Sequence, residues 1–305
     1  LKYNEGDTLK LDTKKKWGIK KFDAVIGNPP YNNKQNNVGK RGGGDSLWNK
    51  FVIKTIEEWI RKDGYVIHVH PSGWRKPESD RSKYKNMFGK MTHERQMIYL
   101  EIHGTKDGMN VFRCGTRYDW YVIKNRENTM KTMIKDEEGK VEEINMLELN
   151  FLPNYGFSKI SKIIAKEGEK NCEVLFSNSA YETRKKWMSK EKDEKFKYQC
   201  IHSTPKNGTI YWYSSVNDKG FFGISKIIFG ESGINEVIMD MTGEYGLTQE
   251  AIGIKIDSLK EGINVKKCFE NDKFKQLLKS CSWSNFRIDW RMFEYFKKDF
   301  YKEFI

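Results

Sequence analysis

Four residues with an unusual capacity for chemistry, Asn28-Pro29-Pro30-Tyr31, directly follow the apolar run 22–27. Each proline fixes its own φ, lacks a backbone N–H, and pushes the residue before it into an extended conformation. We therefore expect Asn28 to be held extended where a buried strand ends. Pro29 then offers a carbonyl oxygen at the same place without adding a donor.

This turn suits a substrate group that has two N–H donors. The side-chain oxygen of Asn28 and the carbonyl oxygen of Pro29 are two acceptors side by side, which could hold an exocyclic amine. Tyr31 adds a π face on which the ring that carries the amine could stack. Accepting both hydrogens keeps the nitrogen lone pair out of the ring and favours attack by the amine on an electrophile. The alternative is a rigid turn after a core strand.

The elements that must position the turn alternate between strand and helix. The pattern predicts strands at 6–11, 22–27, 64–71, 96–104 and 116–125, and an amphipathic helix over 46–62 with Asp45 or Ser46 as its N-cap. This alternation favours the α/β class, with a doubly wound and mainly parallel sheet. Ligands of such sheets bind outside the carboxyl ends of the strands, which is where the turn lies.

A polar segment at 126–150 divides the chain. We expect it to be a linker or hairpin between a first domain at 1–125 and a mixed α+β domain at 151–305. The second domain contains aromatic strand patterns such as 209–215.

The excess of positive charge is concentrated in the first part of the chain. Residues 1–125 hold 25 Lys and Arg against 14 Asp and Glu, whereas 126–305 hold 30 against 28. This excess suggests a polyanionic partner, although a lysine-rich solvated surface would look the same. Five scattered cysteines without a C-x-x-C pattern indicate reduced thiols in a cytoplasmic protein. No apolar run is long enough to cross a membrane.

Two pairs of residues are candidates for contact with a nucleic acid. Lys40 and Arg41 lie in the glycine-rich segment 39–45, which could order against phosphates or remain a solvent loop. Trp74 and Arg75 follow the strand predicted at 64–71 and could line a DNA cleft. Packing of Trp74 in the core is an equal alternative.

Two histidines of the same predicted strand could act together. His68 and His70 are two residues apart, so their side chains share one face and could bind a metal ion. No third ligand lies nearby in the sequence. We therefore favour packing for both, and we predict no metal site.

The turn matches the N-P-P-Y motif of S-adenosylmethionine-dependent amino methyltransferases. The chain resembles the N6-adenine DNA methyltransferases of restriction–modification type, the gamma-like type II and IIG enzymes. The segments that carry this resemblance are 6–11, 47–74, 108–125, 213–228 and 240–254. The resemblance implies a Rossmann-like methyltransferase sheet over 1–125 and a target-recognition domain over 151–305.

The resemblance also implies roles for individual residues. Asn28, Pro29, Pro30 and Tyr31 would be catalytic, in methyl transfer from S-adenosylmethionine to N6 of an adenine flipped out of double-stranded DNA. Phe112 would close over the base opposite Tyr31. Asp7 would approach the adenine of the cofactor.

One part of the family pattern is absent. The glycine-rich F-x-G-x-G motif, which binds the cofactor, does not precede Asp7. We expect one of three situations: the chain is a fragment, a separate N-terminal segment or subunit completes the cofactor site, or the protein no longer methylates. Two other functions stay open. One is a DNA-specificity module without activity, and the other is a protein glutamine N5-methyltransferase, since such enzymes also use N-P-P-Y.

Overall fold

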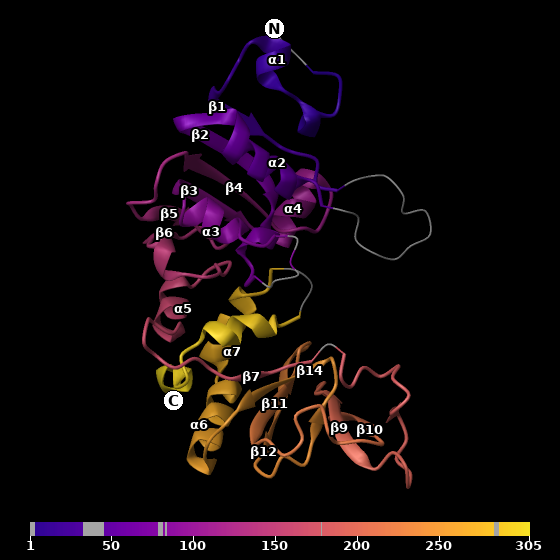
Figure 1. The fold of residues 1–305 in the computed structure, drawn as a ribbon. Helices are drawn as coiled ribbons and strands as arrows, with labels where there is room; N and C mark the ends of the chain where they lie inside the picture. The colour runs from indigo at the N-terminus through magenta and orange to yellow at the C-terminus, as the bar shows by residue number, and fades with distance from the viewer. Residues whose placement is uncertain (1–3, 33–45, 79–81, 83, 178, 284–286) are drawn as a thin grey trace. The chain divides into compact units, whose positions relative to one another are not determined.

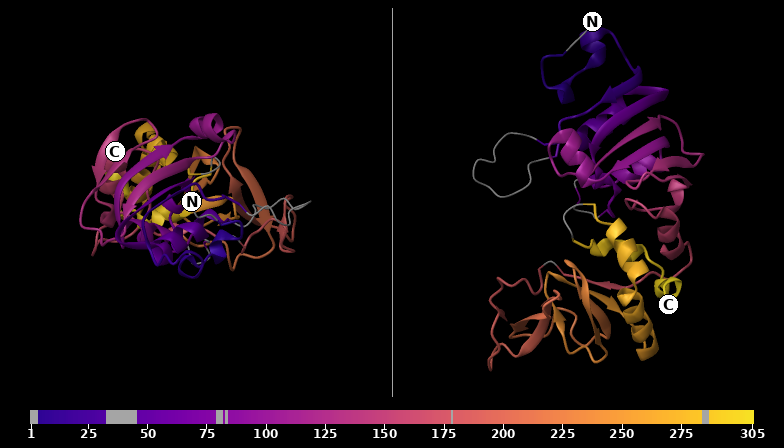
Figure 2. Two further views of the ribbon diagram at one scale, coloured as in Figure 1. Left: turned by 90° about the horizontal axis from the view of Figure 1, so that it is seen from above. Right: turned by 180° about the vertical axis from the view of Figure 1, so that it is seen from behind.

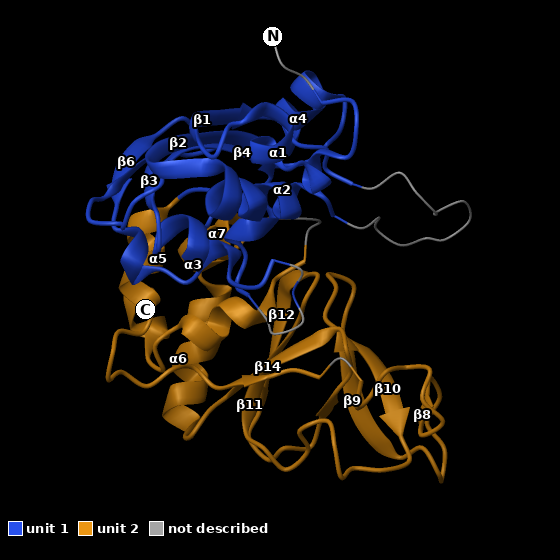
Figure 3. Ribbon diagram, turned by 45° about the horizontal axis from the view of Figure 1, so that its top comes forward, with its two compact units in different colours: residues 1–155 blue, residues 156–305 orange. Residues whose placement is uncertain are grey.

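The chain folds into two compact units, Leu1–Tyr155 and Gly156–Ile305 (Figure 3). The structure is a computed structural model, and it describes residues 4–32, 46–78, 82, 84–177, 179–283 and 287–305. The boundary between the units lies after the segment 126–150 that was expected to hold it. The reason is that this segment forms two strands of the sheet of unit 1.

Unit 1 is built on a six-stranded sheet with the order β1-β2-β4-β3-β5-β6 (Figure 1). The strands are β1 (Phe22–Gly27), β2 (Ile60–Pro71), β3 (Gln96–His103), β4 (Tyr118–Lys124), β5 (Thr132–Lys135) and β6 (Val141–Ile144). The predicted α/β class is confirmed, but the prediction of a mainly parallel sheet is wrong. Strands β1 and β2 pair in parallel, as do β3 and β5, whereas β4 is antiparallel to both of its neighbours and β5 is antiparallel to β6. The connection between β5 and β6 is a turn that is too short for a parallel crossover, so these two strands can only be antiparallel.

The helices of unit 1 are short. They are α1 (Thr13–Trp17), α2 (Trp48–Lys54), α3 (Met87–Thr92) and α4 (Thr105–Phe112), with 3-10 turns at Thr8–Lys10, Ser72–Arg75 and Met146–Glu148. The helix predicted over 46–62 is α2 followed by a π-helical turn at Thr55–Trp59, after which Ile60 begins β2. Ser46 does not cap it, because Ser46 pairs with Asn32 in an isolated bridge and Leu47 precedes the helix.

The prediction of a strand at 6–11 is wrong. Thr8–Lys10 is a 3-10 turn that Asp7 caps, with the Asp7 carboxylate accepting from the N–H of Leu9 at 3.0 Å. An aspartate that bonds the backbone two residues ahead favours a turn over a strand, and this local bond outweighs the alternation of apolar residues.

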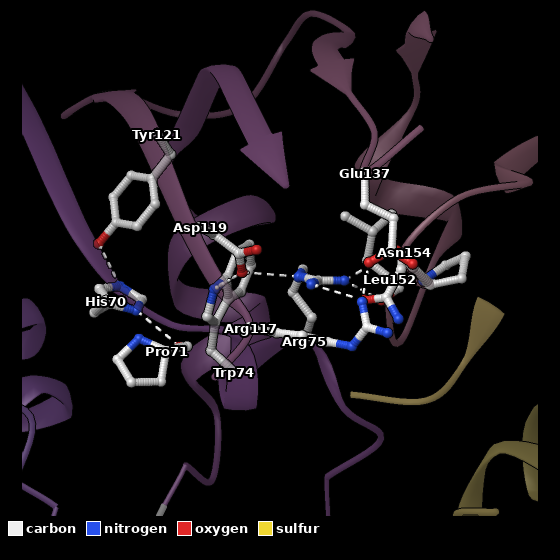
Figure 4. A network of polar contacts seen from close by, with 11 residues as sticks. His70, Pro71, Trp74, Arg75, Arg117, Asp119, Tyr121, Glu137, Leu152 and Asn154 are labelled. Atoms are coloured by element: carbon white, nitrogen blue, oxygen red, sulfur yellow. Dashed lines mark hydrogen bonds and ion pairs between the residues drawn. The ribbon is translucent and has the colours of Figure 1, made fainter. Parts of the chain in front are cut away.

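A buried polar network holds unit 1 together (Figure 4). The Asp119 carboxylate accepts from Trp74 Nε1 at 2.9 Å and from Arg75 Nε at 2.8 Å. The other guanidinium nitrogens of Arg75 donate to the carbonyls of Leu152 and Pro153 and to Asn154 Oδ1, at 3.0–3.2 Å. Burial raises the pKa of Asp119, and the bonds from Arg75 and Trp74 oppose this shift. The network ties the end of β2 to β4 and to the last residues of unit 1.

Unit 2 contains two four-stranded sheets, with the orders β13-β9-β10-β8 and β12-β11-β14-β7. The strands are β7 (Val174–Leu175), β8 (Met188–Ser189), β9 (Tyr198–Ser203), β10 (Ile210–Ser214), β11 (Lys226–Gly230), β12 (Gly233–Asp240), β13 (Gly246–Leu247) and β14 (Ala251–Lys255). The helices are α5 (Phe157–Ile163), α6 (Leu259–Glu270) and α7 (Asp272–Ser280), with 3-10 turns at Trp290–Tyr295 and Phe300–Glu303. Helix α6 packs against β11 and β12 (Figure 2).

The core of unit 2 is rich in phenylalanine. Its rings meet in a chain of edge-to-face, tilted and stacked contacts with centroids 4.7–6.5 Å apart, formed by Phe229, Phe269, Phe274, Phe293, Phe296 and Phe300. None of the helices in the described parts of the chain combines the length and apolar character needed to cross a membrane.

The network of Figure 4 predicts a large loss of stability on Asp119→Asn. The amide keeps the shape of the side chain but leaves the fully buried Arg75 charge uncompensated, which costs about 3–5 kcal/mol. Urea denaturation followed by tryptophan fluorescence measures this loss. Asp23→Asn is the matched control, because the pair of Asp23 with Arg61 is exposed and contributes less than about 1 kcal/mol. Equal shifts in the two variants would contradict the role of the network.

Candidate active site

The Asn-Pro-Pro-Tyr turn begins where β1 ends. Gly27, the last residue of β1, lies opposite His68 of the parallel strand β2. Pro29 is buried, whereas Asn28 and Pro30 are exposed. The carbonyl of Tyr31 accepts from the N–H of Leu47 at 3.1 Å, which fixes the end of the turn to the start of α2. The turn therefore lies at a strand end, as predicted, but the prediction that this strand is buried is wrong, because no residue of β1 is buried and Ile26 is 74% exposed.

A cavity of about 650 Å³ opens beside the turn. Its volume lies within the range of roughly 300–1,000 Å³ that is typical of small-molecule sites. Its wall is formed by the 3-10 turn at Thr8–Lys10, the end of β1, α2 with its π-helical turn, and β2. The residues of the wall are Asp7, Thr8, Leu9, Val25, Ile26, Gly27, Asn28, Pro29, Pro30, Leu47, Phe51, Thr55, Trp59 and His68. The structure thus brings Asp7 and Asn28, both predicted from the sequence, to one cavity.

Two side chains in this wall carry polar atoms that are buried without a partner. Thr55 is fully buried, and His68 is 4% exposed. Neither Thr55 Oγ1 nor His68 Nδ1 has a hydrogen-bond partner among the described residues. Such a group costs about 1–3 kcal/mol when it stays unpaired. A ligand with hydrogen-bonding groups in the cavity would offset this cost, so the wall fits a polar ligand.

Thr55 owes its position to the π-helical turn. The N–H of Ile60 donates to the carbonyl of Thr55, a bond that spans five residues. Turns of this kind are rare and occur frequently at functional sites. Here the turn brings Thr55 and Trp59, four residues apart, into the same wall.

Tyr31 and Phe112 contact each other, although 81 positions separate them in the sequence. Their ring centroids are 5.9 Å apart at an interplanar angle of 68°. A ring stacked between two others needs roughly 7 Å, at about 3.5 Å for each contact. The two rings would therefore have to separate and turn to hold a planar base between them. Burial raises the pKa of Tyr31 to about 12, so its hydroxyl remains protonated near neutral pH.

A polar cluster holds Phe112 from behind. The Phe112 ring meets Tyr118 edge-on at 4.8 Å, and Tyr118 stacks on His103 at 4.4 Å. The Tyr118 hydroxyl donates to Asp107, which also lies 2.9 Å from His103 Nδ1. Asp107 and Phe112 both belong to α4, so the cluster anchors the helix that carries Phe112 to β3 and β4.

Of the four residues predicted as candidates for DNA contact, two are buried and two lie outside the described residues. Trp74 and Arg75 have no exposed side-chain surface, because Asp119 and the carbonyls of the 152–154 segment engage them in the core. Their burial means that the prediction of a DNA cleft lined by these two residues is wrong. Lys40 and Arg41 lie outside the described residues. His68 and His70 share one buried face, and His70 stacks on Trp48 at 4.2 Å.

Sequence reasoning missed the cavity residues of α2 and β2. The helical stripe around Phe51 and Trp59 predicted burial, but it could not show that the buried face borders a cavity. The cluster of His103, Asp107 and Tyr118 was missed as well. Its only local signal is the i,i+4 spacing of His103 and Asp107, which is too common to be specific.

In unit 1, an α/β sheet thus delivers an Asn-Pro-Pro-Tyr turn to a cavity at the carboxyl end of a strand. Residues 3–106 match the family of the Eco57I restriction-modification methylase. This match confirms the predicted resemblance to methylases of restriction-modification systems.

Individual relatives are distant. The modification methylase CviBIII of Paramecium bursaria Chlorella virus NC1A is 25% identical over 167 residues, which are 50% of this chain and 41% of that protein. The chain thus spans about two fifths of the relative. The DNA complex of the type IIL restriction-modification enzyme MmeI is similar over 94% of this chain and 47% of that one, at 8% identity and a TM-score of 0.48. The M protein of the type I restriction enzyme EcoKI is similar over 43% and 28%, at 15% identity and a TM-score of 0.32.

The burial of His68 predicts a pH dependence of stability. Desolvation lowers its pKa to about 4, from a value near 6.5 in the unfolded chain. Between these values the unfolded chain binds a proton that the folded chain does not, so acidification through this window destabilises the fold by up to about 1.4 kcal/mol per pH unit.

His68→Phe removes this contribution, and it breaks no hydrogen bond of the His68 Nδ1 atom with the described residues. We expect urea midpoints at pH 7.5 that equal or exceed those of the wild type, and a smaller fall between pH 6.5 and pH 4.5. An identical fall in the two proteins would show that His68 does not titrate as described.

Proposed function

We propose that this protein transfers a methyl group from S-adenosylmethionine to N6 of an adenine that is flipped out of double-stranded DNA. The observation that supports the proposal most strongly is that one turn borders the cavity and also contacts Phe112. Asn28, Pro29 and Pro30 line the cavity, while Tyr31, the next residue, contacts Phe112. A ligand in the cavity and a ring held at Tyr31 would therefore meet at Asn28.

Asn28 and Pro29 would act on the amine. The Asn28 side-chain oxygen and the Pro29 carbonyl accept its two hydrogens, which keeps the nitrogen lone pair available for attack. Pro29 and Pro30 restrict the backbone directly after Asn28, so the Pro29 carbonyl and the backbone that carries the Asn28 side chain are oriented before the substrate arrives. Orientation of this kind can supply a large part of a rate enhancement.

Tyr31 and Phe112 would hold the base. Extrusion of a base from the duplex costs a few kcal/mol, and stacking on aromatic rings returns about 1–3 kcal/mol for each contact. The edge-to-face contact of the two rings is soft enough to be replaced by a base between them. The anchoring of α4 by Asp107 and Tyr118 would limit how far Phe112 can move.

The cofactor would lie in the cavity. When bound, S-adenosylmethionine supplies an electrophilic methyl group on a positively charged sulfur. Asp7 borders the cavity, and its carboxylate could accept from an amino group of the nucleoside. Thr55 and His68 offer the unpaired polar atoms of the wall to the same ligand.

A further segment, of this chain or of a separate subunit, would complete the cofactor site. Strand β1 is at one end of the sheet order among the described strands, and the side chain of Ile26 on it is 74% exposed. An open edge beside a binding cavity is suited to pairing with another strand. The glycine-rich motif of the family would lie on such a segment.

Unit 2 would read the DNA sequence. It presents lysines over aromatic rings, with Lys219 and Lys185 at 5.0 and 5.8 Å from the centroid of Trp187. Side chains of this kind contact phosphates and bases. In this proposal unit 1 performs the chemistry and unit 2 selects the site.

Two other functions would use the same features differently. A glutamine side-chain amide also has two N–H donors, so Asn28 and Pro29 would suit a protein glutamine N5-methyltransferase. A DNA-specificity module without activity would keep unit 2 and bind DNA but no cofactor. Methyl transfer that requires DNA excludes both.

The proposal predicts that Asn28→Ala lowers methyl transfer by about 100-fold or more, because one of two acceptors for the amine is lost. DNA affinity should change less than twofold, because the Asn28 amide does not contact the DNA phosphates in this proposal. Transfer of labelled methyl groups to DNA and a DNA titration measure the two quantities. Asn32→Ala is the matched control, an exposed asparagine of the same loop. Equal activity of the two variants would remove Asn28 from the mechanism.

A further inference from the structure

His103 lies between two carboxylates and stacks on Tyr118, the residue that meets the Phe112 ring. Its Nδ1 atom is 2.9 Å from Asp107 Oδ2 on α4, and its Nε2 atom is 3.5 Å from Glu101 Oε1 on β3. The imidazole and the Tyr118 ring are nearly parallel, with centroids 4.4 Å apart and an interplanar angle of 2°. Both nitrogens of the imidazole thus face a carboxylate.

The hydrogen bonds of this cluster place a proton on His103 Nδ1. Burial and the bond to Asp107 raise the pKa of Tyr118, so its hydroxyl keeps its proton and donates it to the Asp107 carboxylate. Because Asp107 Oδ2 is an acceptor, the His103 nitrogen that faces it must be a donor. In a neutral imidazole Nε2 then has only a lone pair. This atom is buried, has no hydrogen-bond partner among the described residues, and lies toward Glu101.

Glu101 is held in place by two further residues. Its Oε2 atom accepts from the Tyr99 hydroxyl at 3.0 Å, and its Oε1 atom accepts from Lys135 Nζ at 3.0 Å. A neutral His103 would therefore direct a buried lone pair at a fixed carboxylate oxygen. A proton on Nε2 replaces this repulsion by a charge-assisted hydrogen bond.

Charged and titratable groups face His103 from each element around it. They are Tyr99 and Glu101 on β3, Asp107 on α4, Tyr118 and Asp119 on β4, and Lys135 on β5. The carboxylates favour an imidazolium, and the Lys135 ammonium opposes it. Arg75 already compensates Asp119, and Arg117 is paired with Glu137. The charge of His103 is therefore set mainly by Glu101 and Asp107 against Lys135.

We propose that His103 is a positioning residue for base capture: as an imidazolium it bridges Glu101 and Asp107 and so holds Tyr118 against the Phe112 ring. This inference rests on the proposed function, because it assumes that a flipped base is held between Tyr31 and Phe112. A ring that is already held loses less conformational freedom when a base stacks on it.

Loss of the Nε2 proton would weaken this arrangement. Asp107 then bonds a neutral partner, and Nε2 again faces Glu101 with a lone pair. The Tyr118 ring, which meets Phe112 edge-on at 4.8 Å, is held less firmly. Base capture therefore weakens as the pH rises through the ionisation of His103.

His103→Gln tests this role, because glutamine can donate to Asp107 but carries no charge. The probe is a duplex that the wild type selects from a random-sequence pool, with 2-aminopurine replacing each adenine in turn. Its fluorescence at saturating protein reports extrusion of the base. For the wild type we expect it to fall severalfold, at most about tenfold, between about pH 5.5 and 8, which is what one charge-assisted hydrogen bond supplies. The variant should give the low value throughout.

Two other histidines of unit 1 do not contribute to this change. Burial lowers the pKa of His68 to about 4 and that of His70 to about 3, so both stay neutral over the range. The matched control is His202→Gln in unit 2. His202 is 17% exposed and lies 3.6 Å from the Glu250 carboxylate, much as the 21% exposed His103 lies beside Glu101. This control should keep the pH profile of the wild type.

His103→Arg should restore capture at the alkaline end. Arginine stays charged, offers a planar face to Tyr118 and can donate to both carboxylates. The fluorescence with this variant should be high and independent of pH. Melting temperatures show whether the variants fold, and if the arginine variant does not, the comparison of the wild type with His103→Gln decides alone.

The outcomes separate the inference from the proposed function. A wild-type pH profile in His103→Gln would overturn the inference, and so would equal losses in folded glutamine and arginine variants. If the wild type extrudes the base equally at both ends of the range, only the inference fails. If the wild type binds DNA and extrudes no base at any pH, the proposed function fails together with it.

Discussion

Pro29 and Pro30 impose the constraint on which the site of unit 1 depends. Neither residue has a backbone N–H, so neither can donate to an extension of the β1–β2 ladder, which ends at Gly27. The chain leaves the sheet there, and the bond from Leu47 N–H to the Tyr31 carbonyl returns it to α2. The cavity, the acceptors of Asn28 and Pro29, and the position of Tyr31 all follow from this exit.

The stability of unit 1 and its proposed activity draw on different parts of the sheet. In the buried network, Trp74 Nε1 and Arg75 Nε both donate to Asp119 Oδ2, which fixes the end of β2 to β4, and only Asp119 Oδ1 among its side-chain atoms stays without a partner among the described residues. In the cavity wall, Thr55 Oγ1 and His68 Nδ1 have no partner among the described residues either. A buried polar group without a partner lowers the free energy of unfolding. Such groups are found at sites where a bound ligand offsets this loss.

The sequence was sufficient for the features that depend on neighbouring residues. Apolar runs predicted β1 and β4 within two residues of their ends, and the N-P-P-Y motif predicted the turn that follows β1. The contact between Tyr31 and Phe112 was expected from the family resemblance of both segments and not from neighbouring residues. Features that depend on distant partners could not be predicted. Arg75 looked like a surface cation because its partner, Asp119, is 44 positions away. The antiparallel place of β4 between β2 and β3 is likewise set by the packing of the whole sheet, and the alternation of strands and helices cannot show it.

In the proposed reaction, the turn at the end of β1 activates the exocyclic amine of adenine. The most direct test supplies the protein, expressed from its complete gene, with methyl-labelled S-adenosylmethionine and unmethylated DNA. The digested nucleosides are then separated and identified by mass spectrometry. We expect label in N6-methyladenine and in no other nucleoside. Label in a methylated cytosine, or no labelled nucleoside although DNA is bound, would contradict it.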